Sequence, residues 1–319
     1  MHKKGAIIMA NQNSLKNLIA QKDALKSNVG SYGTRIRYDA GYTRFLGFVD
    51  ENFHIQKIAN IKDKHVYAYV ENLKANGAQP TTIRTELCAI RYFHKLTGSR
   101  NKLPENNKLH LANRETGTIN RAWLPTEIEK ALKVADETDR TDVKFAVRAS
   151  WLFGLRIHEV AKLRVEDISR AIQYGELTVK GKGGFVRAIR IHNNAQEELL
   201  AEIPAYAKEN KLEKGDRAIA ASRFTGVAKE ISSLKAWVYN HRHRFTVEDR
   251  TSLVGKGEKD RSEKLTFHGL RYTYTQDYSK HLRVVGAPNA ARQLSESLGH
   301  HRESITKIYM AEKPGKKAA

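Results

Sequence analysis

Residues 297–310 read SLGHHRESITKIYM, with a histidine, His300, directly after a glycine and a tyrosine, Tyr309, nine residues further on. The charged stretch between them has helical character, so we expect Tyr309 on a helix close to the end of the chain. A tyrosine at this distance after a histidine suggests that the two side chains take part in a reaction. A reaction site would also need side chains from other parts of the sequence.

Four earlier residues have equally specific placements. Arg156 follows FGL at the start of an apolar helix, and Lys182 lies in the Gly-rich turn KGKGG. His268 and Arg271 in FHGLRYT are three residues apart and share a helix face. Taken singly, each has an ordinary interpretation: an ion pair of Arg156 with Glu159, a solvated lysine and a hydrogen-bonded core histidine. His300 is then a surface residue and Tyr309 a packing aromatic.

Taken together, these side chains suit a phosphodiester better than a metal ion. They include no carboxylate cluster, whereas planar guanidinium groups can neutralise the extra negative charge of a pentavalent phosphorane with paired hydrogen bonds. A tyrosine becomes a nucleophile when nearby cations or a base draw away its proton. A lysine or an imidazole can protonate the leaving oxygen.

The charge of the chain favours a polyanion as its partner. Lys and Arg number 56 and Asp and Glu 35, which gives a net charge of +21. Such an excess favours nucleic acid, although ribosome-associated and anionic-membrane proteins share it. No apolar run approaches the roughly 20 residues of a spanning helix, and the start MHKKGAIIMA has too short an apolar patch for a signal peptide. Met9 is a second possible start, and we expect a cytoplasmic protein.

The first part of the chain, residues 14–98, reads as a series of helices. The clearest is PTTIRTELCAIRYFHKLTG, in which the apolar positions Ile83, Leu87, Ile90 and Phe93 predict a core-facing stripe. The single cysteine, Cys88, excludes an intramolecular disulfide, and its place in this helix predicts a buried thiol. The opposite face suits either solvent or a phosphate backbone, through Arg84, Arg91 and Lys95.

Polar, aperiodic sequence from residue 99 to 122 predicts a linker between two domains. We place a leader at 1–30, a helical domain at 31–113, the linker at 114–122 and a second domain at 123–319. The second domain combines helices with a β-hairpin in GELTVKGKGGFVRAIRI, residues 175–191. Residues 213–264 are rich in Lys, Arg, Ser and Gly, and 266–310 are helical again. The predicted fold is mainly α with one small hairpin, in two domains.

The order of the motifs resembles one known family. The segments GLRIHEVAKLRVEDI, VKGKGGFVRAIRI, HGLRYT, SLGH and SITKIY follow one another as in the tyrosine recombinases, the phage integrase family. The resemblance covers residues 124–310. It implies a tyrosine recombinase catalytic domain at 123–319 and a helical, SAM-like core-binding domain that contacts DNA at 31–113.

The resemblance also implies a role for each candidate residue. Arg156 and Arg271 clamp the scissile phosphate, and Lys182 protonates the 5′-oxygen leaving group. Lys180, two residues earlier, is the alternative for that lysine. His268 assists proton transfer, His300 hydrogen-bonds the phosphate, and Tyr309 forms a 3′-phosphotyrosyl bond. In this chemistry no metal, cofactor or ATP takes part.

The implied function is site-specific recombination of double-stranded DNA. Four protomers would assemble on two DNA sites, and each would grip a specific core site alone, because residues 1–30 are too few for a separate arm-site-binding domain. We expect a bacterial or phage-encoded, nucleoid-associated protein that integrates or excises a mobile element, with the tail MAEKPGKKAA in partner contacts. A type IB topoisomerase and a catalytically inactive DNA-binding accessory protein are the alternatives.

Overall fold

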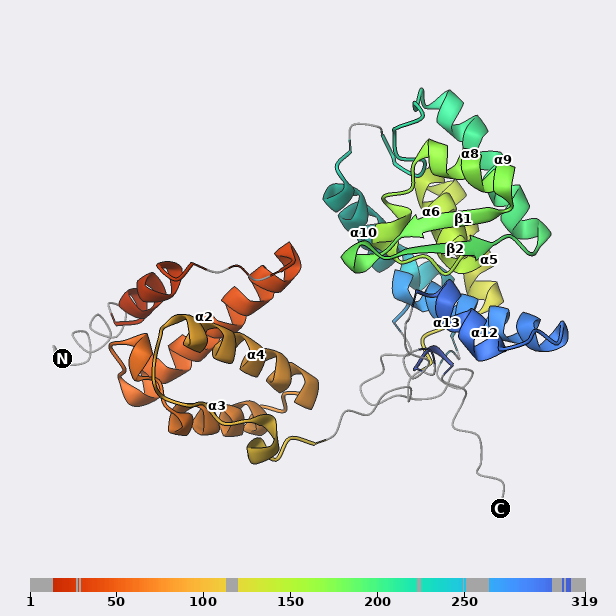
Figure 1. The fold of residues 1–319 in the computed structure, drawn as a ribbon. Helices are drawn as coiled ribbons and strands as arrows, with labels where there is room; N and C mark the ends of the chain where they lie inside the picture. The colour runs from red at the N-terminus through yellow and green to blue at the C-terminus, as the bar shows by residue number, and fades with distance from the viewer. Residues whose placement is uncertain are drawn as a thin grey trace, which may run out of the picture. The chain divides into compact units, whose positions relative to one another are not determined.

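The computed structural model describes residues 14–26, 28, 30–112, 120–222, 225–248, 250, 264–299, 306 and 308–310, and the backbone alone at Lys182. The chain forms two compact units that divide between residues 115 and 116, inside the expected linker (Figure 1). In these residues the units are mainly helical, and the strands form one two-stranded sheet. The predicted fold class is therefore confirmed.

The first unit is a small helical domain. Its elements are a helix over residues 14–23, α2 (Tyr32–Phe53), the 3-10 turn η1 (Ile58–Asn60), α3 (Asp63–Ala75), α4 (Pro80–Leu96) and η2 (Asn106–Leu109). All four positions of the predicted α4 stripe are buried in its core, where Phe93 stacks on Tyr42 with ring centroids 4.7 Å apart. Leu18 is fully buried in the same core. This part of the expected leader therefore packs into the first unit.

Cys88 does not belong to the buried stripe of α4. The thiol is free and exposed, so the predicted buried thiol is wrong. An α-helix turns by about 100° per residue, and one step beyond Leu87 carries the side chain out of the stripe that the apolar residues define. The stripe itself continues through Ile90, which is fully buried.

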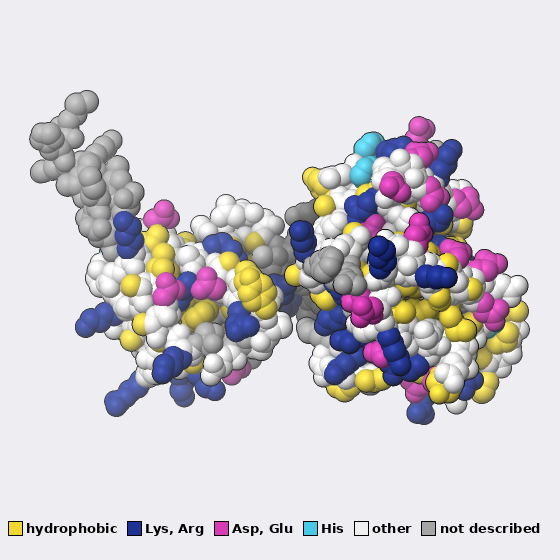
Figure 2. All heavy atoms as spheres, turned by 90° about the horizontal axis from the view of Figure 1, so that it is seen from above, with side chains coloured by type: hydrophobic (Ala, Val, Ile, Leu, Met, Phe, Trp, Pro, Cys, Tyr) yellow, Lys and Arg dark blue, Asp and Glu magenta, His cyan; other side chains and the backbone are white. Residues whose placement is uncertain are grey.

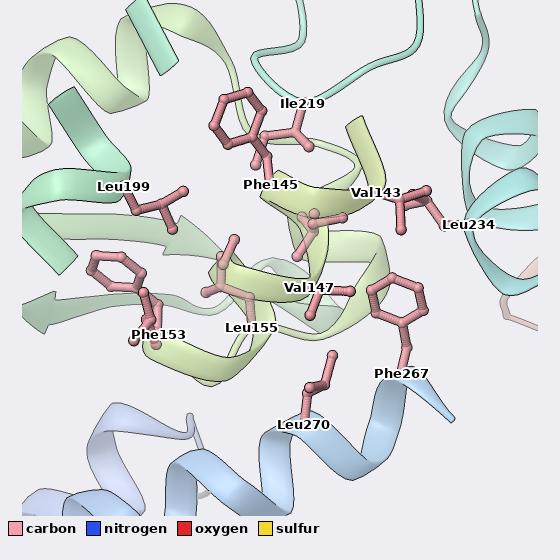
Figure 3. Packing of buried hydrophobic residues seen from close by; sticks show 14 of the residues in the cluster. Val143, Phe145, Val147, Phe153, Leu155, Leu199, Ile219, Leu234, Phe267 and Leu270 are labelled. Atoms are coloured by element: carbon pink, nitrogen blue, oxygen red, sulfur yellow. The ribbon is translucent and has the colours of Figure 1, made fainter. Parts of the chain in front are cut away.

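The second unit surrounds α6 (Thr141–Leu152) with helices and one hairpin. Its other elements are α5 (Pro125–Glu137), α7 (Ile157–Val160), α8 (Val165–Tyr174), β1 (Glu176–Lys180), η3 (Lys182–Gly184), β2 (Val186–Arg190), α9 (Asn194–Glu209), α10 (Val227–Phe245), α12 (Phe267–Val284) and α13 (Ala290–Ser297). Figure 3 shows Val147 of α6 pointing toward Leu270 and Phe267 of α12, with Leu199 of α9 on another side of the core. Packing on α6 thus fixes the position of α12.

The hairpin forms where the β-branched runs flank glycines, as predicted. Leu177 faces Ile189 and Val179 faces Arg187 across antiparallel strands, and this face of the hairpin turns inward. The turn passes through Gly183 and Gly184 with φ of 78° and 84°. Only glycine adopts such values at little cost, so the sequence KGKGG suits this turn.

Helix α10 lies inside the stretch that the sequence showed only as rich in Lys, Arg, Ser and Gly. Its buried side is aromatic: the Trp237 ring stacks on Phe245, and Phe245 stacks on Trp123. Trp237 also donates from Nε1 to Thr138 Oγ1 at 3.1 Å. The many polar residues belong to the outer face of the helix and obscured its apolar period.

The first residues of the second unit run across α12. Trp123 N donates to Thr273 Oγ1 at 2.8 Å, and Trp123 Nε1 donates to the carbonyl of Thr266 at 2.9 Å. A Cβ on Gly269 would lie 2.4 Å from the carbonyl oxygen of Arg121. Only glycine allows this close crossing, which ties α12 to the beginning of the unit.

Candidate active site

Arg271 lies at the centre of the candidate site, on the second turn of α12. Its side chain is fully buried and donates to the carbonyl oxygens of Gly154 and Leu298. Gly154 has φ of 60°, and a Cβ there would meet the Tyr274 ring at 2.3 Å. These carbonyls orient the guanidinium group from two distant loops. Burial first, and then the charge of Arg156, lower the pKa of Arg271 to about 9, so a bound anion would stabilise its charged form.

Arg156 is held by a buried carboxylate. Its backbone N–H donates to Glu159 Oε2 at 2.8 Å and its Nη1 donates to Glu159 Oε1 at 2.9 Å. The ion pair that the sequence offered as the ordinary interpretation therefore exists. A quarter of the Arg156 side chain remains exposed, so the pair orients this arginine without enclosing it.

Arg187, on strand β2 of the hairpin, is a second arginine that binds Glu159. It binds both oxygens of Glu159, at 2.9 and 2.7 Å, and its Nε donates to the carbonyl of Ser297 at 2.8 Å. Burial alone would raise the pKa of Glu159, but hydrogen bonds and charge from Arg187 and then Arg156 hold it at about 2. We call Arg156, Glu159 and Arg187 the carboxylate network. It connects α7, β2 and the end of α13.

His268 lies one turn before Arg271 on α12 and is exposed to solvent. Its ring is flanked by Tyr272 at 5.6 Å and Tyr309 at 5.5 Å between centroids. Enclosure by protein atoms first, and then the charges of Arg271, Arg121 and Arg156, lower its pKa to about 4. The imidazole is thus neutral at pH 7 and can accept a proton.

Tyr309 packs beside these groups. Its residue is 8% exposed, its ring lies 4.6 Å from the Tyr272 ring, and the guanidinium carbon of Arg271 lies 5.7 Å from its centroid. Gln276 Nε2 donates to the Tyr309 carbonyl at 3.4 Å and to Asn120 Oδ1 at 3.0 Å. The structure therefore brings Tyr309, His268 and Arg271 together, with Arg156 close enough to lower the pKa of both His268 and Arg271.

Two candidates fall outside the described residues: the side chain of Lys182 and all of His300. The backbone near each is described. Lys182 begins the turn after Gly181, and a Cβ on Gly181 would lie 3.2 Å from Glu159 Oε1. Gly299, just before His300, would contact the Arg187 side chain at 3.1 Å in the same way. The carboxylate network thus lies against Gly181 and Gly299, the glycines that precede the two positions in the sequence.

The three arginine and lysine candidates of α4 differ in their contacts. Arg84 donates to the carbonyl of Ala112 at 2.9 Å, and Arg91 donates to Pro104 O and to Asn106 Oδ1. Lys95 is exposed. Two of the three side chains therefore hold the segment after α4 in place, and their contact with DNA stays a prediction.

Comparison of the sequence with known protein families gives two matches. The phage integrase family matches residues 121–315, and the SAM-like N-terminal domain of phage integrases matches residues 22–101. The chain belongs to the phage integrase family. It is a tyrosine recombinase, an enzyme that breaks and rejoins DNA. The matched segment contains all six candidate catalytic positions.

Individual relatives of this tyrosine recombinase are distant but match along most of their length. Tyrosine recombinase XerC of Natranaerobius thermophilus is 24% identical over 285 residues, covering 88% of each chain. XerD of Caulobacter vibrioides is 25% identical over 302 residues, covering 92% of this chain and 89% of the relative. A solved lambda integrase (75–356) dimer bound to a COC′ core site has a TM-score of 0.63 at 15% identity, covering 93% and 95%.

The sequence did not reveal two features of the candidate site: the central place of Glu159 and the presence of Arg187. A signal for Arg187 was present: in VRAIRI it has the same strand phase as Ile189, which predicts an inward side chain. A charged residue at an inward position needs a buried partner.

Within the described residues, no three His, Cys, Asp or Glu side chains form a metal-binding group, and no helix is long and apolar enough to cross a membrane.

Proposed function

We propose that the recombinase cleaves a specific DNA core site with Tyr309 and forms a 3′-phosphotyrosyl intermediate. The observation that supports this most directly is the packing of the Tyr309 ring against His268 and beside the Arg271 guanidinium group. A buried cation, a neutral imidazole and a tyrosine side by side suit attack on a phosphodiester.

In the proposed step, the Tyr309 hydroxyl oxygen bonds to phosphorus while the bond from phosphorus to the 5′-oxygen breaks. His268 assists removal of the tyrosine proton, and Lys182 gives a proton to the leaving oxygen. Arg156 and Arg271 bind the non-bridging oxygens, where charge increases in the transition state. We propose His300 as a further hydrogen-bond donor to the phosphate.

Rejoining is the same step in reverse. The 5′-hydroxyl of a partner strand attacks the phosphotyrosyl bond, so the energy of the broken bond is conserved and ATP is not needed. The residues assigned above supply both the charge and the protons of the reaction. We therefore propose that cleavage proceeds without a divalent metal ion.

We further propose that four protomers act on two DNA sites, in the cytoplasm, to integrate or excise a mobile element. A lambda integrase tetramer bound to a Holliday junction shares the fold at a TM-score of 0.61, which supports the tetramer. The net charge of +21 fits a DNA partner. Figure 2 shows Lys and Arg side chains over the visible face of each unit.

The test is covalent trapping. Nicked duplexes from DNA around the gene, in which cleavage releases a short fragment, are incubated with the protein in EDTA and separated on denaturing gels. We expect an adduct with wild type and with Tyr278→Phe, a matched control on α12 whose ring stacks on Tyr274. Tyr309→Phe should give none.

Other outcomes distinguish the alternatives. Relaxation of any supercoiled plasmid without a defined site would indicate a type IB topoisomerase. Tight, salt-sensitive binding with no adduct on any duplex would indicate an inactive DNA-binding accessory protein. An adduct that Tyr309→Phe still forms would contradict the assignment of the nucleophile.

A further inference from the structure

The tip of the hairpin exposes apolar surface. Phe185 is 61% exposed and Val186 is 64% exposed, directly after the turn that contains Lys182. Hydration of so much apolar surface is unfavourable. Tyr174, the last residue of α8, is as exposed at 67%, but it precedes the opposite end of β1. Phe185 is therefore exposed at the turn end of the hairpin, whereas Tyr174 is exposed near the opposite end.

The Phe185 ring and Lys182 share this tip. Three peptide units separate their Cα atoms, which limits the distance between them to about 10 Å. Gly181 N donates to the carbonyl of Phe185 at 2.7 Å and closes the turn. A Cβ on Gly183 would lie 3.4 Å from two carbons of the Phe185 ring, so the ring lies over a glycine that leaves it room.

The surroundings of the tip are defined by the proposed function, on which this inference rests. If Lys182 protonates the 5′-oxygen, the tip lies beside the cleaved phosphate, and the Cα of Phe185 lies within about 10 Å of the Cα of Lys182. Phosphate oxygens attract cations such as the exposed Lys180, which pairs with Val186 across the hairpin. A phenyl ring gains nothing from phosphate, and its complementary surface on DNA is a base.

In proteins that bind the minor groove of DNA, apolar side chains frequently enter between neighbouring base pairs and partly unstack them. We propose that Phe185 inserts against the base step beside the cleaved phosphate and unstacks it. Phe185 is then a residue that determines specificity. It favours steps that open easily, such as pyrimidine–purine steps, because less energy is needed to unstack them.

The first experiment does not require cleavage. Duplexes selected by tight binding to the Tyr309→Phe protein carry 2-aminopurine at successive positions, and its fluorescence reports unstacking. We expect fluorescence to rise at one step. Phe185→Ala should remove most of that rise, Phe185→Trp should keep it, and Tyr174→Ala should leave it unchanged. Equal fluorescence with Phe185→Ala and with the parent protein would overturn the proposal.

The second experiment separates unstacking from support of Lys182. With Tyr309 present, Phe185→Ala should slow adduct formation about tenfold, the scale of one lost base–aromatic contact. A mismatch at the same step unstacks it in advance and should restore the rate to within about twofold, since its stacking energy no longer has to be overcome. A bridging 5′-phosphorothiolate, which bypasses leaving-group protonation, should not restore it. Restoration by the phosphorothiolate and not by the mismatch would assign Phe185 to the support of Lys182 and overturn the proposal.

Failure of the proposed function has a different signature. In that case wild-type protein forms no adduct on any duplex, whatever residue 185 is. The fluorescence result still decides the role of Phe185, because it is measured on bound and uncleaved DNA.

Discussion

Arg187 and Arg271 are arginines of the second unit whose side chains have little exposed surface, and their partners differ. Arg187 binds both oxygens of Glu159, a fully buried carboxylate. Arg271 donates to two backbone carbonyls, and its pKa is lowered by burial and by the charge of Arg156. The charge of Arg187 is therefore neutralised by a carboxylate within the fold. The guanidinium group of Arg271 is oriented by two backbone carbonyl dipoles and lies near the positive charge of Arg156.

We propose that this difference distinguishes an arginine that stabilises the fold from one that acts in the reaction. A buried ion pair with matched geometry holds elements together, and here it connects the hairpin, α7 and the end of α13. A buried cation near other cations gains most when an anion binds. Substitution of Arg187 should therefore affect mainly stability, whereas substitution of Arg271 should affect mainly reaction rate.

The largest expected effect is on stability, from Arg187→Met. Removal of Arg187 takes two hydrogen bonds from the buried Glu159 carboxylate and leaves Arg156 as the remaining cation of the carboxylate network. The free energy of unfolding at pH 7 should fall by about 3–4 kcal/mol, toward the lower end for a broken buried pair. Denaturant unfolding measures this, and the double variant Arg187→Met/Glu159→Gln should recover part of the loss. The pKa of Glu159 is held at about 2, so its contribution is present above pH 4.5 and lost as pH falls toward 2. An unchanged midpoint of denaturant unfolding for Arg187→Met would contradict the stabilising role of Arg187 and so the difference drawn between the two arginines.

The next effect is on rate, from Arg271→Lys. An ammonium group cannot reproduce two planar, oriented hydrogen bonds to a phosphate, so adduct formation should slow by about 10² to 10³. Arg283→Lys, at an exposed position near the end of the same helix, is the matched control and should match wild type. If Arg271→Lys formed adducts at the wild-type rate, the assigned role of this guanidinium group would be wrong.

The smallest effect is the pH dependence due to His268. Its pKa is about 4 in the folded protein and 6.5 in the unfolded chain, so the unfolded chain binds more protons between these values. Stability should therefore fall as pH is lowered from 6.5 toward 4. Since solvent screens this exposed residue, we expect a loss of about 1 kcal/mol at pH 5 relative to pH 7. The loss should be absent in His268→Asn, and an identical loss in both proteins would show that other groups cause it.

The sequence predicted the local features of this molecule better than its long-range partners. The hairpin, the α4 stripe and the shared face of His268 and Arg271 depend on residues a few positions apart, and periodicity reveals them. The bond from Arg187 to Ser297 joins residues 110 positions apart, and no local pattern encodes it. For the same reason, charge alone could not show that Arg91 binds Pro104.

The central claim is that Tyr309 carries the DNA, and the most direct measurement is mass spectrometry of the adduct trapped in EDTA. Tyr272 is the informative competitor, because its ring lies 4.6 Å from that of Tyr309 and also flanks His268. After proteolysis and nuclease treatment, we expect the remaining nucleotide on Tyr309 alone, attached through a 3′-phosphate. A nucleotide on Tyr272 or on any other side chain, or an adduct that forms only with a divalent metal ion, would contradict the account.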